Sequence, residues 1–349
     1  MSDLIEHLSK TRASQNGQFD RQSLAGLDLT ECRFNGCSFK ASDLSNTKLT
    51  KAVFVNCDLS QADLSAADMS EVLFQECKLS ETNATGSTLT AAIFAKSALD
   101  KVDFEQANLH EATFDKAKLT SVSFKQTALT KCALLASEVE HCDFSGADLR
   151  RATLTGLDLQ TSIFKSSKLG ETYFEGSNLS GQAFEGCELK GVIFYKAILH
   201  QANFAKRNLQ SVFFSHADLA GAAFPATHLR QVSFEKAIID KADFSGAQID
   251  ACVFTGVSAK QAVFDRVSMT QAILAGANLA GSRWQHAKLI KCEMSKTVLD
   301  DCDFTEATLQ WINLHDASQE KTIWDKAGFS NVKGTDPNRL TAEKWQPPT

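Results

Sequence analysis

The sequence predicts a repeat fold in which the chain turns every five residues along almost its whole length. Of the 62 positions that end in 4 or 9 between Leu24 and Phe329, all but Ala84, Ala259 and Gln319 carry a large apolar residue. Two residues before these positions the residue is small (Ala, Cys, Ser, Thr or Val) in 56 of 62 cases. No insertion interrupts the register. A period of five fits neither an α-helix nor the simple alternation of a β-strand.

Several segments carry a recognisable motif. Ala62-Asp63-Leu64-Ser65, Ala107-Asn108-Leu109-His110 and Ala147-Asp148-Leu149-Arg150 resemble the A(D/N)LXX motif of pentapeptide-repeat proteins. The resemblance covers about residues 22 to 331. It implies an all-β fold, a right-handed quadrilateral β-helix in which four pentapeptides form one coil and the large and small positions point inward. The 62 repeats then give about 15 coils, with short caps at both ends because a solenoid exposes its terminal units.

Three segments follow from this interpretation: an N-terminal cap (1–21), the pentapeptide-repeat β-helix (22–331) and a C-terminal cap or tail (332–349). Leu4, Ile5 and Leu8 indicate a short cap helix, and the stretch from Asp336 to Leu340 indicates a turn that enters a short helix. All four tryptophans lie in the last quarter of the chain, which predicts an apolar C-terminal end. An uncovered sheet end favours aggregation, so this end either caps itself or forms a partner interface. Family members dimerise through their C-terminal ends, and the resemblance therefore implies a homodimer as one alternative.

A second period lies within the first. Positions that end in 4 are Phe in 20 of 31 cases, and positions that end in 9 are Leu in 22 of 31 cases. With four faces to a coil, alternate repeats occupy opposite faces. We therefore expect Phe to stack on two opposing faces and Leu on the other two, as core packing and not as a cofactor site.

The cysteines and histidines, which could form a catalytic or metal site, follow the repeat pattern. All ten cysteines occupy the small inward position, which predicts buried, reduced thiols that form neither disulfides nor a metal site. The seven histidines within the array fall at outward-facing positions, and none belongs to a metal-binding motif. Catalytic groups usually sit on loops, and a gapless repeat offers none. We expect no catalytic residue, no metal and no cofactor, and hence no enzyme.

Composition restricts the partners and the compartment. The formal charge of −6, from 42 acidic and 36 basic residues, is too mild to predict direct binding of nucleic acid. No apolar run approaches the roughly 20 residues of a membrane span, and the N-terminus lacks the apolar core of a secretory signal. We expect a soluble, cytoplasmic protein.

The surface must then carry the function, and six residues are candidates for binding a partner. Asp43, Asp63 and Asp103 recur at equivalent positions on the most acidic face. Arg207 stands where a small inward residue is expected, so that it is turned outward by a local bulge or is paired. Trp311 and Trp324 belong to the apolar C-terminal end.

Two functions remain open. The first is a non-enzymatic scaffold or adaptor that binds proteins, and the resemblance extends to repeat proteins associated with bacterial secretion. The alternative is a DNA-mimicking modulator of DNA gyrase or topoisomerase IV, similar to quinolone-resistance proteins of the family. The mixed charge is weaker than a DNA mimic would need, since duplex DNA carries one charge per ~1.7 Å of its axis.

Overall fold

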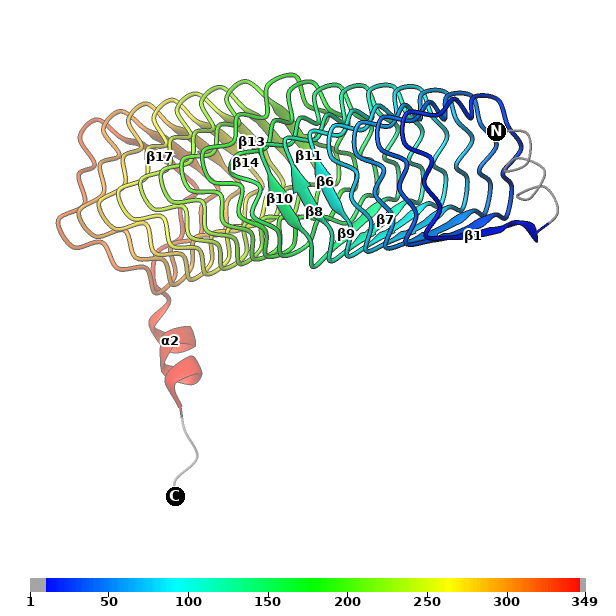
Figure 1. The fold of residues 1–349 in the computed structure, drawn as a ribbon. Helices are drawn as coiled ribbons and strands as arrows, with labels where there is room; N and C mark the ends of the chain where they lie inside the picture. Colours follow the sequence, from blue (N-terminus) through cyan, green and yellow to red (C-terminus); the bar gives the residue numbers. More distant parts are fainter. Residues whose placement is uncertain (1–10, 346–349) are drawn as a thin grey trace. The chain divides into compact units, whose positions relative to one another are not determined.

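Parallel strands that pair at a spacing of 20 residues build the structure, a computed structural model that describes residues 11–345. The chain forms two units. Unit 1 comprises Met1–Asn178 and Phe184–Glu188, and unit 2 comprises Leu179–Ala183 and Leu189–Thr349. The helix predicted around Leu4, Ile5 and Leu8 lies outside the described residues. The stacked coils of each unit can be followed in Figure 1.

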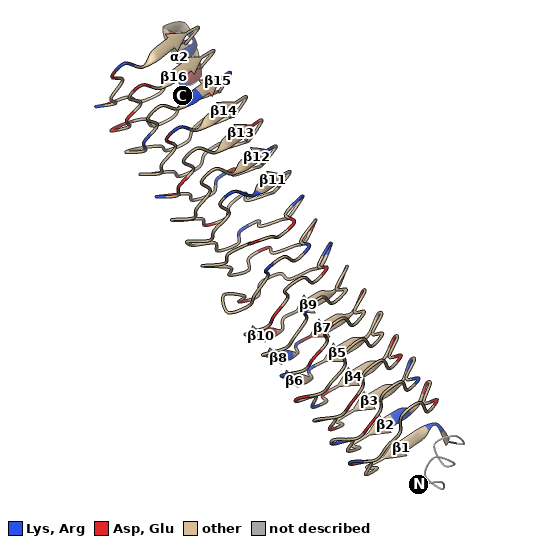
Figure 2. Cartoon of the chain, turned by 90° about the horizontal axis from the view of Figure 1, so that it is seen from above, with Lys and Arg blue, Asp and Glu red and all other residues tan. Residues whose placement is uncertain are grey.

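Unit 1 contains two parallel sheets. The larger sheet has the order β1-β2-β3-β4-β5-β7-β9 and the smaller one β10-β8-β6. Figure 2 shows these strands as successive rungs. The strands of the larger sheet are β1 (Ala13–Gln15), β2 (Arg33–Asn35), β3 (Val53–Val55), β4 (Leu73–Gln75), β5 (Ile93–Ala95), β7 (Thr113–Asp115) and β9 (Ala133–Leu135). Those of the smaller sheet are β6 (Ala98–Asp100), β8 (Lys118–Thr120) and β10 (Glu138–Glu140).

Unit 2 contains one parallel sheet of seven strands in sequence order, followed by a short helix. Its elements are β11 (Asn208–Gln210), β12 (His228–Arg230), β13 (Gln248–Asp250), β14 (Ser268–Thr270), β15 (Lys288–Ile290), β16 (Thr308–Gln310), β17 (Gly328–Ser330) and α2 (Pro337–Lys344). In both units the remaining repeats pair through isolated parallel bridges at the same spacing, such as Asp43↔Asp63. Four pentapeptides therefore complete each coil, and the predicted quadrilateral β-helix is confirmed, with about 16 coils.

Each corner of a coil places one residue in the left-handed region of backbone space. The residue two positions after the large apolar one has φ near +50° to +70°, as at Ala66 (φ 55°) and Gly276 (φ 68°). At most corners the next backbone N–H donates to the carbonyl of the large residue, as from Ala67 to Leu64 at 3.2 Å. A positive φ at the third position of a turn is the mark of a type II turn. This corner explains a period of five.

The large residues form ladders inside each unit. On the face that contains Phe34, Phe54 and Phe74, here called the Phe54 face, successive rings stack with centroids 4.9 and 5.1 Å apart. On the opposite face, the rings of Phe224 and Phe244 stack at 4.6 Å. The expected stacking of Phe on two opposing faces is confirmed, apart from an early pair on a third face between Phe19 and Phe39.

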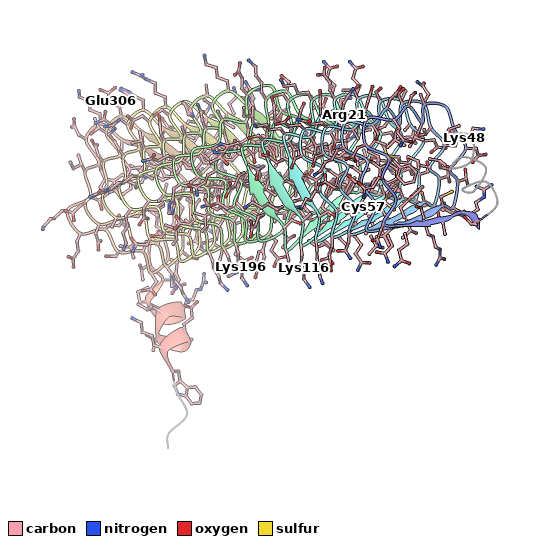
Figure 3. The ribbon with its side chains drawn as sticks, viewed as in Figure 1. Arg21, Lys48, Cys57, Lys116, Lys196 and Glu306 are labelled. Carbon is pink, nitrogen blue, oxygen red and sulfur yellow. The ribbon has the colours of Figure 1, made fainter. Side chains whose placement is uncertain are left out.

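Several small inward residues that carry a thiol or hydroxyl group form the same hydrogen bond. Their side chains donate to a carbonyl of the previous coil, as from Cys57 Sγ to Phe34 O at 3.4 Å and from Ser97 Oγ to Phe74 O at 3.1 Å. Cys, Ser and Thr can therefore replace one another at this position. All ten cysteines are free thiols, and nine are buried, which confirms their predicted placement. Figure 3 shows Cys57 within the ribbon.

The C-terminal segment forms the helix that the sequence indicated. Asp336 caps α2: its side chain accepts hydrogen bonds from the backbone N–H groups of Asn338 and Arg339, and Pro337 opens the helix. No residue of α2 is buried, and Figure 1 shows it standing away from the last coils of unit 2. Phe329 in β17 stays 52% exposed, so α2 does not cover the end of the ladder.

Candidate functional site

The three aspartates singled out by the sequence lie on the face of unit 1 that contains Leu64, where they form hydrogen bonds with the backbone. Each is half-buried, and each accepts a hydrogen bond from the backbone N–H two residues ahead: Asp43 from Ser45, Asp63 from Ser65 and Asp103 from Glu105, all at 3.0 Å. The hydrogen bonds from Ser45 lower the pKa of the Asp43 carboxyl. This is the task of the Asp or Asn in the A(D/N)L motif, because the side chain mimics a turn of the backbone.

Arg207 is accommodated without a bulge. Its backbone N–H donates to Phe204 O at 3.1 Å, and its carbonyl accepts from His228 at 2.9 Å, as in an ordinary repeat. The side chain is half-buried, and its Nε donates to Ala205 O at 3.3 Å. The guanidinium group escapes the interior by folding back over its own turn.

The two tryptophans lie in different surroundings. Trp324 is half-buried and stacks on Phe304, with the ring centroids 4.4 Å apart, so it continues an aromatic ladder. Trp311 occupies a corner with φ 59° and is 59% exposed. The six candidate residues are thus not gathered into one site within either unit.

One prediction about the histidines is wrong. His315 was expected to face solvent, but its side chain is only 2% exposed. The segment after the last coil passes over it: the backbone N–H of Asp336 donates to His315 Nδ1 at 3.1 Å. The repeat pattern predicts which residues point outward from a coil, but it cannot predict that the segment after the last coil covers one of them.

An exposed apolar row is the most distinctive surface feature of unit 1. It lies on the Phe54 face, at the position just before each large inward residue. Val53, Leu73 and Ile93 are register neighbours in β3, β4 and β5. Ile93 is 42% exposed, and Tyr173, at the equivalent position, is 44% exposed. Outward side chains of a solenoid are ordinarily polar, so this row is a departure that packing does not require.

Unit 2 carries a row of the same kind on the face whose buried residues are Phe194, Phe214, Phe234 and Phe254, which we call the Phe54 face of unit 2. Ile193, Phe213, Ser233, Val253 and Ile273 follow one another through parallel bridges. Phe213 is 46% exposed and Ile273 is 43% exposed. We call the two sets the unit 1 row (Val53, Leu73, Ile93, Tyr173) and the unit 2 row (Ile193, Phe213, Val253, Ile273). Thr113, Ala133 and Thr153 lie between Ile93 and Tyr173 in the first row, and Ser233 lies within the second.

The sequence analysis missed both rows, although the signal is visible. The pairs Val53-Phe54, Leu73-Phe74, Ile93-Phe94, Tyr173-Phe174 and Phe213-Phe214 place two large apolar residues side by side at a spacing that is a multiple of 20. Only the second residue of each pair can point inward. A search for charged residues alone does not find the first, outward-facing residue of each pair.

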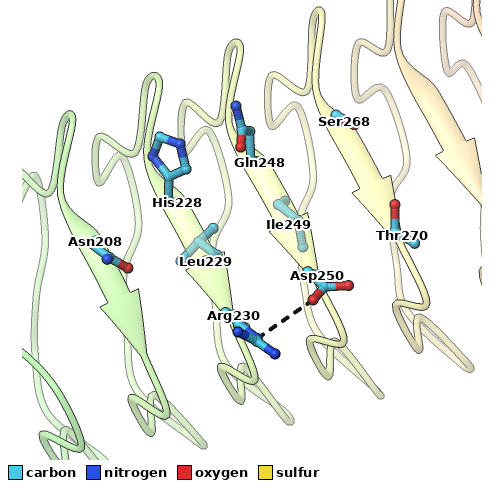
Figure 4. A pocket seen from close by; sticks show the side chains of 9 residues that line it. All are labelled: Asn208, His228, Leu229, Arg230, Gln248, Ile249, Asp250, Ser268 and Thr270. Carbon is cyan, nitrogen blue, oxygen red and sulfur yellow. Dashed lines mark ion pairs between the residues drawn. The ribbon is translucent and has the colours of Figure 1, made fainter.

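A shallow groove also crosses the sheet of unit 2, with a volume of about 390 Å³. Figure 4 shows its walls: one row with His228 and Gln248, and another with Arg230 and Asp250. Arg230 Nε lies 3.8 Å from Asp250 Oδ2, so the two charges compensate each other across neighbouring strands. The groove therefore presents no net charge from this pair, and Leu229 and Ile249 also line it.

Comparisons with known families decide the family. The model of the pentapeptide repeat region matches residues 27–104, 97–174 and 187–264. A second model, of eight pentapeptide repeats, matches 247–283 and 285–318. The chain belongs to the pentapeptide-repeat family. Residues 175–186 separate two matches of the first model and include two points, after Asn178 and after Ala183, at which the chain passes between the two units.

Among solved structures, the chain is similar to other pentapeptide-repeat proteins at low identity. The plasmid-mediated fluoroquinolone resistance protein QnrB1 is 19% identical, with a TM-score of 0.48 over 52% of this chain and 90% of its own. HetL, involved in heterocyst differentiation regulation in Nostoc sp. strain PCC 7120, is 18% identical, with a TM-score of 0.21 over 94% of each chain. A thylakoid-lumen protein of Arabidopsis thaliana is 32% identical over 28% of this chain and 63% of its own, with a TM-score of 0.23. No curated protein matches the sequence.

The buried thiols differ in their pKa, because a hydrogen bond with Cys57 lowers the pKa of the Cys77 thiol whereas burial alone has the opposite effect. Burial raises the pKa of the Cys142 thiol to about 12, which keeps it protonated at neutral pH. Within residues 11–345, no cluster of three or more His, Cys, Asp or Glu side chains could hold a metal ion. The same residues include no helix long and apolar enough to cross a bilayer.

Proposed function

We propose that this pentapeptide-repeat protein is a non-enzymatic scaffold that binds another protein through its exposed apolar rows. The observation that carries the proposal is the recurrence of large aliphatic and aromatic side chains at one outward position of the Phe54 face in each unit. Contiguous exposed apolar surface marks sites of protein association in soluble proteins. Aromatic residues such as Tyr173 and Phe213 are enriched at such interfaces.

The rows suit a protein partner better than a small molecule. They lie on regular strands or bridged coils, where the spacing of neighbouring side chains follows the strand spacing of ~4.8 Å. Such a surface is extended and lacks the concavity that buries a small ligand. It can instead contact several side chains of a partner at once. An adaptor in bacterial secretion would be one such scaffold.

Site-specific cross-linking tests the proposal. A photo-reactive phenylalanine analogue replaces Phe213 in the unit 2 row. In the matched control it replaces Ile238, which is 41% exposed on a neighbouring face. The two proteins are irradiated in lysate, and the adducts are identified by mass spectrometry. We expect a protein adduct from position 213 that Ile273→Ser weakens, and little adduct from position 238. Equal yields from the two positions would contradict the proposal.

The topoisomerase alternative makes a separate prediction. It rests on the acidic positions Asp43, Asp63 and Asp103, whose carboxylates could meet a basic groove. If it holds, the purified protein changes supercoiling by DNA gyrase, and changing the three aspartates to Lys abolishes the effect. Because these aspartates also hold their turns, the variant with three Asn residues serves as the control for folding. No effect of the unaltered protein on supercoiling would eliminate this function.

The homodimer predicted for the C-terminal end remains a proposal beside these. The exposed Phe329 at the end of the ladder is the observation in its favour. Sedimentation of the full chain, compared with its Phe329→Ser variant, measures it: a dimer that the variant dissociates supports the proposal, and a monomer contradicts it.

A further inference from the structure

His315 plays no part in the proposed function, but it lies where the C-terminal segment meets the last coils. His315 follows Leu314 in the coil beneath the C-terminal segment, and its imidazole is almost fully buried. Its two ring nitrogens face different groups. Nδ1 accepts the backbone N–H of Asp336, and Nε2 lies 3.8 Å from Glu343 Oε2 in α2. The imidazole of His315 therefore lies close to both the N-cap and the last turn of α2.

Few other contacts attach α2 to the coils. No residue of α2 is buried, so apolar packing contributes little. Glu343 Oε2 lies 2.7 Å from Lys296 Nζ, which projects from the coil before His315. The other oxygen, Oε1, accepts from Arg339 within the helix itself at 2.8 Å. Thr335 Oγ1 accepts the backbone N–H of Asp316 at 3.1 Å just before the helix. Lys296 and His315 are thus the side chains of the coils that face Glu343.

The hydrogen bond from Asp336 determines the protonation state of the attached form. An N–H group can donate only to an unprotonated nitrogen, so Nδ1 carries no proton and the neutral ring carries its proton on Nε2. A second proton would have to enter at Nδ1. Two N–H groups would then point at each other where a hydrogen bond of 3.1 Å now forms. A buried cation would also lose its hydration.

The surrounding charges do not offset this cost. Glu343 would attract an imidazolium ion, but its carboxylate is already shared by Lys296 and Arg339. The Asp336 carboxylate accepts the two N–H groups of its helix cap. The carboxylate of Glu293, in the previous coil, is held by Asn313 and by the backbone of Ser295, and it also attracts Arg339 of α2.

We propose that His315 is a pH-dependent latch: its neutral imidazole holds α2 on the last coils, and its protonation releases the helix. Histidine is the side chain that ordinarily changes charge between pH 5 and 8. Glu343 keeps its charge throughout that range, because the hydrogen bonds from Lys296 and Arg339 lower its pKa to about 2. The release therefore reports on the imidazole alone.

Hydrogen exchange on the full chain tests the latch. The protection of the segment 335–344 is measured between pH 8 and pH 5.5 and corrected for the intrinsic exchange rate. We expect it to fall about tenfold as one buried, charge-sensitive hydrogen bond is lost. In His315→Gln the side-chain oxygen can accept the Asp336 N–H without titrating, so the pH step disappears. His228→Gln, at an outward position of β12, is the matched control and keeps the step.

A second variant separates the imidazole from the ion pair. Lys296→Met removes the cation and leaves the bond to Nδ1, so protection falls at every pH but the pH step remains. A step that persists in His315→Gln and vanishes in Lys296→Met would overturn the proposal. So would constant protection of the unaltered protein across this pH range.

Discussion

At the scale of the residue, the corner of each coil sets the strongest local demand. Fifty residues other than glycine adopt a positive φ among the described residues, and almost all stand at positions that end in 1 or 6. This conformation is unfavourable for L-residues because the Cβ atom crowds the backbone. The array accepts the cost at each corner because the corner places the next large residue inside. Short polar side chains such as Asp63 supply a compensating hydrogen bond to the same turn.

Two glycines allow the free-energy cost of the positive φ at a corner to be measured. The corner residue Gly276 has φ +68°, and a Cβ atom there would meet nothing within 4 Å. Gly328, in strand β17, offers equally open space and has no positive φ. We expect Gly276→Val to destabilise unit 2 by about 1–3 kcal/mol through backbone strain alone, and Gly328→Val to leave the stability unchanged or higher. Thermal unfolding of the two variants decides, and equal midpoints would contradict the strain argument.

At the scale of the element, two adjacent phenylalanines separate core from surface. Phe214 is fully buried and stacks between Phe194 and Phe234, with both centroid distances 5.1 Å. Phe213 has the same side chain on the outside of the same repeat. The strand period of two sends neighbouring residues to opposite sides of the sheet. Stability and binding can therefore be altered independently at this repeat.

The matched substitutions follow directly. Phe214→Ala opens a cavity inside two contacting ladders and should cost about 3–5 kcal/mol. Phe213→Ala removes exposed surface and should cost about 1 kcal/mol or less, while it weakens binding of a partner to the unit 2 row. Denaturant unfolding gives the first comparison, and the cross-linking assay gives the second. A large stability loss in Phe213→Ala would show that the row is structural.

At the scale of the whole molecule, carboxylates at the turns make the stability depend on pH. Hydrogen bonds from Ser45 lower the pKa of Asp43. Burial raises the pKa of Asp58, but hydrogen bonds from Ser60 and Lys40 outweigh it, so the net shift is downward. A carboxyl whose pKa is lower in the folded state stabilises the protein above its unfolded pKa of about 4. That contribution is lost as the pH falls through the folded pKa.

We therefore expect the midpoint of thermal unfolding to change little between pH 7 and 5 and to fall between pH 4 and 2.5. Asp58→Asn should flatten part of this fall, since the amide does not titrate. Calorimetry at several pH values measures both. A midpoint that stays constant below pH 4 would contradict this account. The proposed latch of α2 is separate, because it involves the C-terminal helix and not the turns of the coils.

The fold could be predicted from the sequence because every repeat carries the same pattern of large and small residues. A large residue at every fifth position, with a small one two residues earlier, leaves only a chain that turns at that interval. The resemblance to pentapeptide-repeat proteins implied the 20-residue coil, and with that coil the Phe ladders and the inward thiols of residues such as Cys57 follow from the repeat pattern. The short helix after Asp336 could be predicted as well, since an aspartate followed by proline is a local signal for a helix start.

The functional surface could be predicted less well, because it depends on what lies outside the repeat or next to it in space. The sequence indicated Asp63 as a candidate binding residue, which stays a prediction, and only the structure shows that its carboxylate also holds its own turn. It placed His315 on the surface, but a segment about 20 residues further along the chain covers it. The unit 2 row becomes a surface only when residues 20 apart, such as Ile193 and Phe213, stack. By itself the sequence determined how the chain turns and which residues fill the interior, since both follow from local periodicity. Only the tertiary structure decided which outward side chains are covered, gathered or free, because those relations join residues that are distant along the chain.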